Sequence, residues 1–204
     1  MYSKRTGLVL GFHGCDEKVL NSVINQSSDL KKSHNSYGWL GHGIYFWENN
    51  PDRALEYAKK LKNNPRSENQ KIERPAVLGA VLDLGYCLDL LDSKNLELMK
   101  VGYELISETV EESDLPINKR PFEEENDLLI RELDCAVIEA LHKFNLENNK
   151  HAFDSVRSVF FEGQDLYPNA GFKEKNHIQI CIRNTNCIKG FFIPRKKDSR
   201  FEIP

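Results

Sequence analysis

A histidine near the start of the chain has a setting that suits ligand binding. His13 stands between Phe12 and Gly14, directly after a short apolar run. Such a run bounded by glycines predicts a buried strand over 7–14, so the imidazole lies at the end of a strand. A neutral imidazole donates one hydrogen bond and accepts another, which suits a sugar hydroxyl. The glycine that follows lets a ligand approach bare backbone groups. Taken alone, the same histidine also fits a purely structural role.

A tyrosine further along has a comparable setting. The segment GWLGHGIYFWE, residues 38–48, places two glycines just before a short β-prone run that carries Tyr45. A tyrosine ring offers a flat face for stacking on an aromatic or cationic ring. The segment is not the dinucleotide fingerprint G-x-G-x-x-G, because Tyr45 and Phe46 occupy the place of its third glycine. Taken alone, this aromatic run also fits a core strand.

The two features together form a familiar order. His-Gly is followed after about thirty residues by G-x-G-I-Y-F and then by a segment with Ala54 and Tyr57 at helical spacing. The chain resembles the ADP-ribosyltransferase superfamily, in its poly(ADP-ribose)-polymerase-like, diphtheria-toxin-type branch. The resemblance is local over 7–58 and extends loosely to 77–90 and to the last two predicted strands. It implies an NAD-binding core made of a split antiparallel β-sheet, with a His, Tyr and Glu signature on three strands.

The resemblance assigns roles to five residues. His13 would hydrogen-bond the 2′-hydroxyl of the adenosine-side ribose of NAD, and the backbone of Gly14 would hold the nicotinamide amide. Tyr45 would stack on the nicotinamide ring. Tyr57 matches a second stacking tyrosine if the register shifts by one residue, and the family's serine near this helix start falls at Arg53. The five residues are the predicted NAD-binding set.

The third signature position departs from the family. The family has a glutamate at the start of the strand that we predict over 177–184. Alternation along HIQICI turns three isoleucines inward and leaves His177, Gln179 and Cys181 on the opposite face, toward the cleft. Sliding the family pattern along these apolar positions puts Gln179 in the place of the glutamate. The predicted catalytic set is therefore His13, Tyr45 and Gln179.

Two acids remain alternatives for the third position, and the choice has chemical consequences. Glu174 lies in the preceding loop, and Glu162 ends the preceding strand. A glutamate would stabilise the positive charge that develops as the glycosidic bond breaks, and losing one such interaction costs on the order of 10²–10³ in rate. Glutamine still accepts a hydrogen bond, but it is neutral and is not a general base. With Gln179 in place we expect single transfer without chain elongation.

The elements that must position these residues follow from hydrophobic spacing and caps. Strands are predicted over 7–14, 44–47, 75–91 (one long strand bending at Gly85), 155–163, 177–184 and 187–194. Helices are predicted over 15–26 with Asp16 as N-cap, 50–64 with Asn50 as N-cap, 93–113 and 121–145. This order indicates an α+β fold, a single domain over 1–204 with a helical insertion at about 92–150.

Three smaller expectations concern the surroundings of the cleft. The acidic run 123–127 is expected to form the first turn of a helix, where carboxylates favour the helix dipole. Trp47 is expected in the core, whereas Trp39 is a candidate for the cleft wall. The turn-rich loop around 166–172 precedes the cleft strand, and the resemblance puts it near the acceptor.

Composition excludes several classes of protein. The net charge is -3 and 40% of the residues are hydrophobic, which is ordinary for a soluble domain with no overall attraction to nucleic acid or membrane. The sequence has no run of the roughly 18 apolar residues that a membrane span needs. Its five cysteines are odd in number and widely spaced, with no zinc-site spacing. We therefore expect reduced thiols, a cytoplasmic location and no metal.

The leading functional hypothesis is an NAD-dependent mono-ADP-ribosyltransferase. It would cleave NAD, its substrate, at the nicotinamide–ribose bond and transfer ADP-ribose to a macromolecular acceptor, either a protein or a nucleic acid. By family habit this suits an intracellular toxin, which brings an antitoxin or inhibitor as a further partner. The alternatives are a catalytically weak module that binds NAD or ADP-ribose, and an NAD glycohydrolase with water as acceptor.

Overall fold

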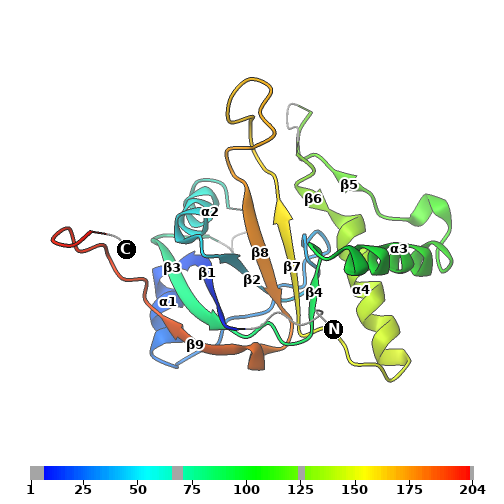
Figure 1. The fold of residues 1–204 in the computed structure, drawn as a ribbon, viewed down its shortest axis with the longest axis horizontal. Helices are drawn as coiled ribbons and strands as arrows, with labels where there is room; N and C mark the ends of the chain where they lie inside the picture. The colour runs from blue at the N-terminus through cyan, green and yellow to red at the C-terminus, as the bar shows by residue number, and fades with distance from the viewer. Residues whose placement is uncertain (1–6, 66–70, 124–126, 203–204) are drawn as a thin grey trace.

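The chain folds around one large β-sheet with helices on both faces. The structure is a computed structural model that describes residues 7–65, 71–123 and 127–202. These residues form four α-helices, a seven-stranded mixed sheet and a small two-stranded hairpin (Figure 1). The α+β class is thereby confirmed. Within the described residues no helix is long and apolar enough to cross a membrane, and all five cysteines are free thiols.

The strand order of the main sheet differs from the order along the chain. Across the sheet it runs β4 (Cys87–Asp89), β7 (Ser155–Phe160), β8 (His177–Ile182), β2 (Ile44–Glu48), β1 (Val9–Asp16), β3 (Pro75–Leu82) and β9 (Ile188–Phe192). The helices are α1 (Glu17–Ile24), α2 (Pro51–Asn63), α3 (Ser93–Ser107) and α4 (Glu132–Glu147), and the hairpin pairs β5 (Asn118–Lys119) with β6 (Ile130–Arg131). β4 and β7 run parallel, whereas the other neighbours are antiparallel, so the expected wholly antiparallel sheet is wrong at this edge.

The two N-terminal helices begin where their caps predict. Asp16 accepts a hydrogen bond from the Lys18 amide at 2.9 Å and starts α1. Asn50 accepts from the Arg53 amide at 3.0 Å, with proline at the first position of α2. These short polar side chains satisfy amides that a helix leaves unpaired in its first turn. The cap of α2 fixes the orientation of Arg53, which matters for the site.

The long strand predicted over 75–91 is wrong. β3 ends at Leu82, and the chain then crosses to the opposite edge of the sheet, where it forms β4. The crossing turns at Gly85, whose φ of +58° is a left-handed conformation that favours glycine. The Asp154 carboxylate accepts from the Tyr86 amide at 2.8 Å and holds the chain beside β7. A tertiary contact thus decides where the apolar run is broken.

The helical middle of the chain is present, but its helices are shorter than predicted. α3 stops at Ser107, and α4 starts at Glu132 instead of residue 121, because 130–131 pairs with 118–119 as a hairpin. Residues 124–126 of the acidic run lie outside the described residues. Asp127 precedes the helix and accepts from the Gly163 amide at 2.6 Å, so it is not a first-turn residue of α4.

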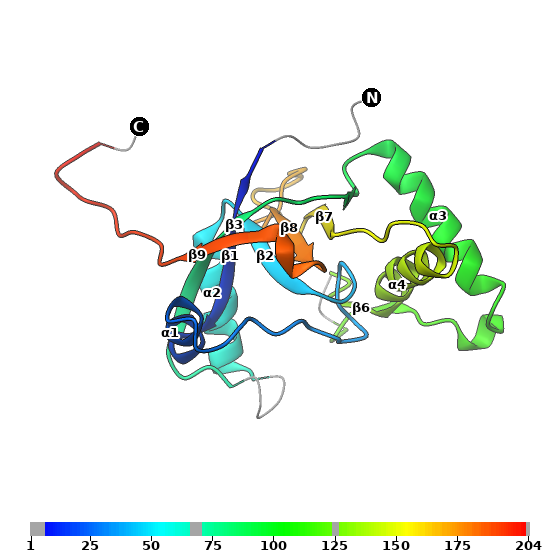
Figure 2. The same ribbon diagram turned by 90° about the horizontal axis from the view of Figure 1, so that it is seen from below.

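The helical middle is also the connection between two parallel strands. Parallel neighbours need a crossover of a dozen or more residues, and the chain from β4 to β7 makes that crossover through α3 and α4. α4 packs on the sheet through Ile138 and Leu141, and α3 packs outside α4 (Figure 2). The segment is therefore part of the sheet's own topology.

The core is divided between the two faces of the sheet. On one face, α1 covers a cluster that includes Phe46, Leu78 and Ile180. On the other face, α2 covers β1 and β3, and α4 covers β7 and β8 (Figure 2). The second face therefore carries two separate helical covers with Gln179 between them, whereas the His13 side chain lies on the first face beside Phe46.

Candidate active site

β1 and β2 are joined over a short distance only. They pair through two residues each, Gly11–Phe12 with Trp47–Glu48. Beyond that point β1 continues along β3 as far as Asp16, while the rest of β2, from Ile44, pairs with β8. The two strands therefore part at the residues that follow Phe12.

His13 stands where the strands part. Its Nδ1 lies 2.8 Å from the carbonyl oxygen of Tyr45 on β2, and its ring lies beside that of Phe46 with the centroids 5.8 Å apart. A carbonyl only accepts, so Nδ1 carries the proton and Nε2 of the neutral ring is an acceptor. Burial lowers the pKa of His13, which keeps the imidazole neutral at pH 7. The ring is thus prepared to accept a hydrogen bond from a hydroxyl.

Gly14 faces the gap between the strands with its backbone. The Leu10 carbonyl accepts from the Asn49 amide at 3.0 Å, which shows that even-numbered residues of β1 direct their N–H and C=O groups toward β2. By alternation along an antiparallel strand, Gly14 points its own polar groups the same way. A Cβ atom on Gly14 would overlap the carbonyl oxygen of Ala54 in α2, so glycine is required at this close approach.

Tyr45 is held by the loop that precedes it. Its hydroxyl donates to the Gly41 carbonyl at 2.6 Å and accepts from the Leu40 amide at 3.0 Å. Gly41 has a φ of +76°, a conformation that favours glycine. The half-buried ring packs beside Leu40 and Cys181, and burial raises the pKa of the phenol. Tyr45 is therefore rigidly placed, on the face of the sheet opposite to the His13 side chain.

Gln179 lies in the middle of the second face. In the register of the sheet it pairs with Trp47 of β2 and with Ser158 of β7, and Trp47 pairs in turn with Phe12 of β1. The next pair along β8 and β2 is Cys181 with Tyr45. Gln179 is thus the cross-strand neighbour of Trp47. It lies two residues from Cys181, which is the cross-strand neighbour of Tyr45.

The alternation predicted for β8 is confirmed. Ile180 and Ile182 lie in the core cluster under α1, whereas Cys181 packs in the cluster under α4 on the other face. His177 and Gln179 share the face of Cys181, as period-two alternation requires. Both side chains are buried.

Arg53 and Tyr57 approach the same face from α2. Arg53 forms a buried ion pair with Glu162 at 2.6 Å and a second one with Glu56 at 3.2 Å. Its guanidinium carbon lies 6.0 Å from the centre of the Trp47 ring, a cation–π distance. One turn later, the Tyr57 ring packs on Trp47 with the centroids 5.0 Å apart. The structure brings both predicted residues to the neighbour of Gln179.

The three candidates for the third signature position have different environments. Glu162 is buried and its carboxylate is bound by Arg53. Glu174 is exposed in the loop between β7 and β8, where its amide donates to the Gln164 carbonyl. Of the three, Gln179 alone is on β8 itself, on the face of the sheet that also carries Cys181. Sequence reasoning missed the pairing of Glu162 with Arg53, because no local pattern links residues so far apart.

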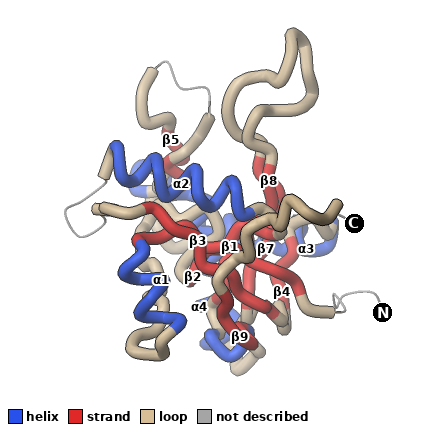
Figure 3. The backbone as a smooth tube through the Cα atoms, turned by 90° about the vertical axis from the view of Figure 1, so that its left-hand side faces the viewer, coloured by secondary structure: helices blue, strands red, loops and turns tan. Residues whose placement is uncertain are grey.

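The remaining expectations about the cleft have mixed outcomes. Trp47 is a core residue, as expected. Trp39 is half-buried, its indole N–H donates to the Leu129 carbonyl at 2.9 Å, and the Arg131 guanidinium lies 4.5 Å from its ring. The loop between β7 and β8 projects beyond both strands and exposes Leu166, Tyr167 and Phe172 (Figures 1 and 3). Whether this loop touches an acceptor stays a prediction.

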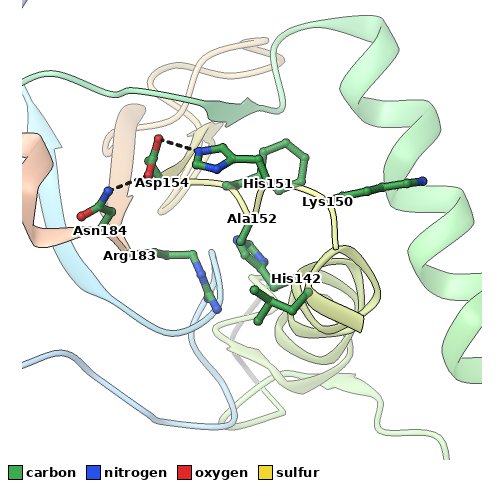
Figure 4. Close-up of a pocket in the computed structure, with 9 residues that line it drawn as sticks. His142, Lys150, His151, Ala152, Asp154, Arg183 and Asn184 are labelled. Carbon is green, nitrogen blue, oxygen red and sulfur yellow. Dashed lines mark hydrogen bonds and ion pairs between the residues drawn. The ribbon is translucent and has the colours of Figure 1, made fainter. Parts of the chain in front are cut away.

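A separate hollow lies at the other end of β8 and contains none of the predicted site residues. It has a volume of about 410 Å³, and its polar lining residues are drawn in Figure 4: His142, Lys150, His151, Asp154, Arg183 and Asn184. The acid of this group is already engaged, because Asp154 accepts from Asn184 at 2.8 Å and lies 3.5 Å from His151. Arg183 is bound to Glu139.

Comparison with known proteins gives one distant relative. The chain is 25% identical over 197 residues to the uncharacterized protein MJ0359 of Methanocaldococcus jannaschii, with 87% of this chain and 83% of the relative covered. No protein-family model matches the chain, and no solved structure matches it. The similarity runs over nearly the whole length of both proteins, so the two chains share more than one motif.

Proposed function

We propose that the protein is an NAD-dependent mono-ADP-ribosyltransferase. The observation that carries the proposal is the place where β1 and β2 part. There the His13 imidazole bonds the Tyr45 carbonyl, and the Gly14 backbone points toward β2. The His-Gly and G-x-G-I-Y-F segments, far apart in the sequence, meet at one point of the fold. This meeting supports a split-sheet NAD-binding core, with β4, β7, β8 and β2 on one side and β1, β3 and β9 on the other.

The site chemistry favours a dinucleotide held across this junction. The neutral His13 ring accepts a hydrogen bond at Nε2 from the 2′-hydroxyl of the adenosine-side ribose. The N–H and C=O of Gly14 pair with the carboxamide of nicotinamide, which has one acceptor and donors in complementary positions. Tyr45 and Tyr57 flank the pyridine ring, and Arg53 borders the nicotinamide end. These five residues are the proposed NAD-binding set.

The proposed reaction breaks the bond between C1′ of the ribose and the nicotinamide nitrogen. Nicotinamide leaves as a neutral molecule, and positive charge develops on the ribose. Gln179 accepts a hydrogen bond from that ribose through its amide oxygen but supplies no negative charge. An anion there would stabilise the transition state electrostatically. A neutral Gln179 therefore supports single transfer, with inversion at C1′ as the acceptor attacks from the opposite side.

A macromolecule is the proposed acceptor. The loop between β7 and β8 supports this, because it exposes Leu166, Tyr167 and Phe172 directly before the strand that carries Gln179. Apolar side chains exposed together mark a surface that another molecule covers. The five free cysteines support a reducing compartment. An intracellular toxin with an antitoxin or inhibitor is the setting we propose.

One observation favours a second candidate, a module that binds NAD or ADP-ribose without catalysis. Gln179 is the only one of the three candidate residues on the cleft face of β8, and it carries no charge. A site without the anion would retain its binding groups and lose rate. A third candidate function for the same site is NAD hydrolysis, with water as the acceptor.

Labelled NAD separates these functions. With wild-type protein and a cell extract, transfer predicts nicotinamide release together with label on a macromolecule. Protease and nuclease digestion then identify the acceptor. Release of nicotinamide without a labelled macromolecule indicates hydrolysis. If no nicotinamide is released but NAD raises the melting temperature of the protein, the protein is a binding module.

Variants of the junction test the site. His13→Ala and Tyr45→Ala are expected to lose NAD binding or turnover at least tenfold, since each removes a proposed NAD contact. His151→Ala is the matched control, because this imidazole is 71% exposed at the distant hollow. Wild-type activity in both junction variants would refute the assignment.

A further inference from the structure

Three buried nitrogen atoms near Gln179 have no hydrogen-bond partner in the described parts of the chain. They are Nε1 of Trp47, Nε of Arg53 and Nε2 of His177. The three residues are only 4%, 8% and 5% exposed. A buried polar atom without a partner is costly, so native proteins nearly always satisfy it with protein, water or a ligand. We call these three atoms the nitrogen cluster.

The nitrogen cluster occupies one small region of the second face. The ring centroids of Trp47 and His177 are 6.4 Å apart, and the Arg53 guanidinium carbon is 6.0 Å from the centre of the Trp47 ring. The rings of Trp39 and Phe160 lie against His177, with centroids 6.3 and 5.8 Å away. Three separate elements, β2, α2 and β8, therefore each bring one of these nitrogens to a region of aromatic rings, bordered by the ion pair of Arg53 with Glu162.

The hydrogen-bonding character of each atom is fixed by its chemistry. An indole N–H and a guanidinium N–H only donate. His177 Nδ1 lies 2.6 Å from the Lys175 carbonyl oxygen, so Nδ1 carries the proton and Nε2 is an acceptor in the neutral ring. Burial lowers the pKa of His177, which favours that neutral form. The nitrogen cluster therefore offers two donors and one acceptor.

A hydroxyl group matches this set. Its oxygen accepts two hydrogen bonds and its proton donates one. A carboxylate or phosphate only accepts, which leaves the His177 lone pair facing an anion. An ammonium or guanidinium only donates, which leaves the Trp47 and Arg53 N–H groups without an acceptor. Of the common acceptor groups for ADP-ribose, the hydroxyl is the one that satisfies all three atoms.

We propose that the nitrogen cluster binds the acceptor hydroxyl and that His177 is the general base of the transfer. The inference rests on the proposed transferase function and adds the chemical class of the acceptor. His177 and Gln179 lie two residues apart on the same face of β8, about 7 Å along the strand. A hydroxyl at the nitrogen cluster thus lies beside the ribose that Gln179 contacts.

The step balances without a further reactant. The hydroxyl oxygen forms a bond to C1′ of the ribose while the bond from C1′ to the nicotinamide nitrogen breaks. The electron pair of that bond leaves with nicotinamide, which is released neutral. The hydroxyl proton passes to Nε2 of His177, and the imidazolium then loses it to solvent. Trp47 and Arg53 hold the oxygen throughout. His177 supplies the base that Gln179 is unable to supply.

The test uses small acceptors with the full chain. Wild-type protein is incubated with labelled NAD in buffer alone, with methanol as an alcohol, and with agmatine as a guanidine. In buffer alone the expected product is free ADP-ribose, and with methanol it is an O-methyl ADP-riboside. The two products distinguish water from an alcohol as the source of the acceptor hydroxyl. Agmatine is expected to yield no adduct. A guanidine adduct as the main product overturns the proposed acceptor class.

His177→Asn tests the base. The asparagine keeps a polar group of similar reach but takes up no proton, so both oxygen-linked products are expected to fall by roughly 10²–10⁴. NAD binding, measured by calorimetry, is expected to stay unchanged. His151→Asn is the matched control. Oxygen-linked products formed at the wild-type rate by His177→Asn overturn the proposal while leaving the transferase function intact. Wild-type protein that fails to cleave NAD refutes both.

If the His177→Asn variant fails to fold, the pH dependence of the wild-type transfer rate tests the proposed base instead. At saturating NAD, which separates the step from binding through His13, the rate is expected to rise with pH through the ionisation of His177 below the ordinary histidine value of 6.5 and to be flat above it. The charged groups that face His177 are Arg53 and Glu56 of α2 and Glu162 after β7, with Arg131 beyond Phe160. A rate that falls as the pH rises, or that stays unchanged down to the lowest pH at which the protein remains folded, overturns the base assignment.

Discussion

At the scale of single residues, the proposed site combines a neutral imidazole and a glycine backbone for binding with a proposed reacting centre that lacks an acid. His13 is neutral and bonded to Tyr45, and the Gly14 backbone faces the gap. Gln179 stands where the chemistry would favour an anion. This combination predicts a slow enzyme that binds NAD well, and a single substitution tests it.

Gln179→Glu is expected to raise the rate of NAD cleavage. The new carboxylate would lie next to the ribose that becomes positive, and such an interaction is worth on the order of 10²–10³ in rate. Nicotinamide release measures the effect. Gln179→Met keeps the volume without a hydrogen-bonding group and is expected to be slower than the wild type. A Gln179→Glu rate at or below the wild-type rate would argue against the proposed place of Gln179 in the reaction.

Much of the residue-level site follows from local sequence, but its partners do not. The spacing of isoleucines correctly put Gln179 on the face of Cys181, because period-two alternation is a local property. The Arg53–Glu162 ion pair and the unpartnered nitrogen of His177 depend on which strands become neighbours. β2 and β8 are adjacent in the sheet yet far apart in the chain, so a single sequence gave no signal for these contacts.

At the scale of elements, a buried ionic group ties three strands together. Arg157 of β7 bonds Glu48 of β2 at 2.6 Å and Asp89 of β4 at 3.0 Å. It reaches Glu48 across β8, which lies between β7 and β2 in the sheet. The Arg157 and Glu48 side chains are each 6% exposed. Removing the cation takes away the guanidinium that both carboxylates bond, which is strongly unfavourable in a buried setting.

Arg157→Met is therefore expected to lower the free energy of unfolding by about 3–5 kcal/mol. Urea denaturation measures this as a shift of the midpoint. Lys100→Met is the matched control, because Lys100 pairs with Glu97 on the surface and such pairs contribute about 0–1 kcal/mol. A shift for Arg157→Met no larger than that of Lys100→Met would show that the buried group contributes little.

Helices and strands were predicted best where a local signal sets their ends. Asp16 and Asn50 start α1 and α2 as predicted, since capping involves only neighbouring residues. The start of α4 was wrong by eleven residues, because pairing of β5 with β6 takes the segment before it. The break at Gly85 was expected as a bend, but the contact with Asp154 that separates β3 from β4 is tertiary.

At the scale of the whole molecule, burial favours the neutral form of three histidines, two of them fully buried and His13 half-buried. Burial lowers the pKa of His13, His142 and His177. In the unfolded chain these imidazoles have ordinary pKa values near 6.5. As the pH falls below 6.5, the unfolded state therefore takes up protons that the folded state does not. Linkage then requires the free energy of unfolding to fall with the pH in that range.

The melting temperature is accordingly expected to drop between about pH 7 and pH 5.5, at a pH where most carboxylates are still ionised. Each buried histidine contributes up to about 1.4 kcal/mol per pH unit. His142→Gln removes one of the three and is expected to give a shallower decline without changing the proposed NAD site. A melting temperature that stays constant or rises between about pH 7 and pH 5.5 would show that the buried histidines do not lower the stability on acidification.

The narrow junction between β1 and β2 also governs how the sheet moves. Two residue pairs, the bond from the Asn49 amide to the Leu10 carbonyl and one imidazole join its halves, and every other seam of the main sheet as described has more residue pairs. The halves are therefore expected to separate in local openings that cost less than global unfolding. Hydrogen exchange should be faster at the Trp47 and Asn49 amides than within the β1–β3 ladder. A dinucleotide bound across the seam would slow these amides first, so protection would report occupancy before any reaction occurs.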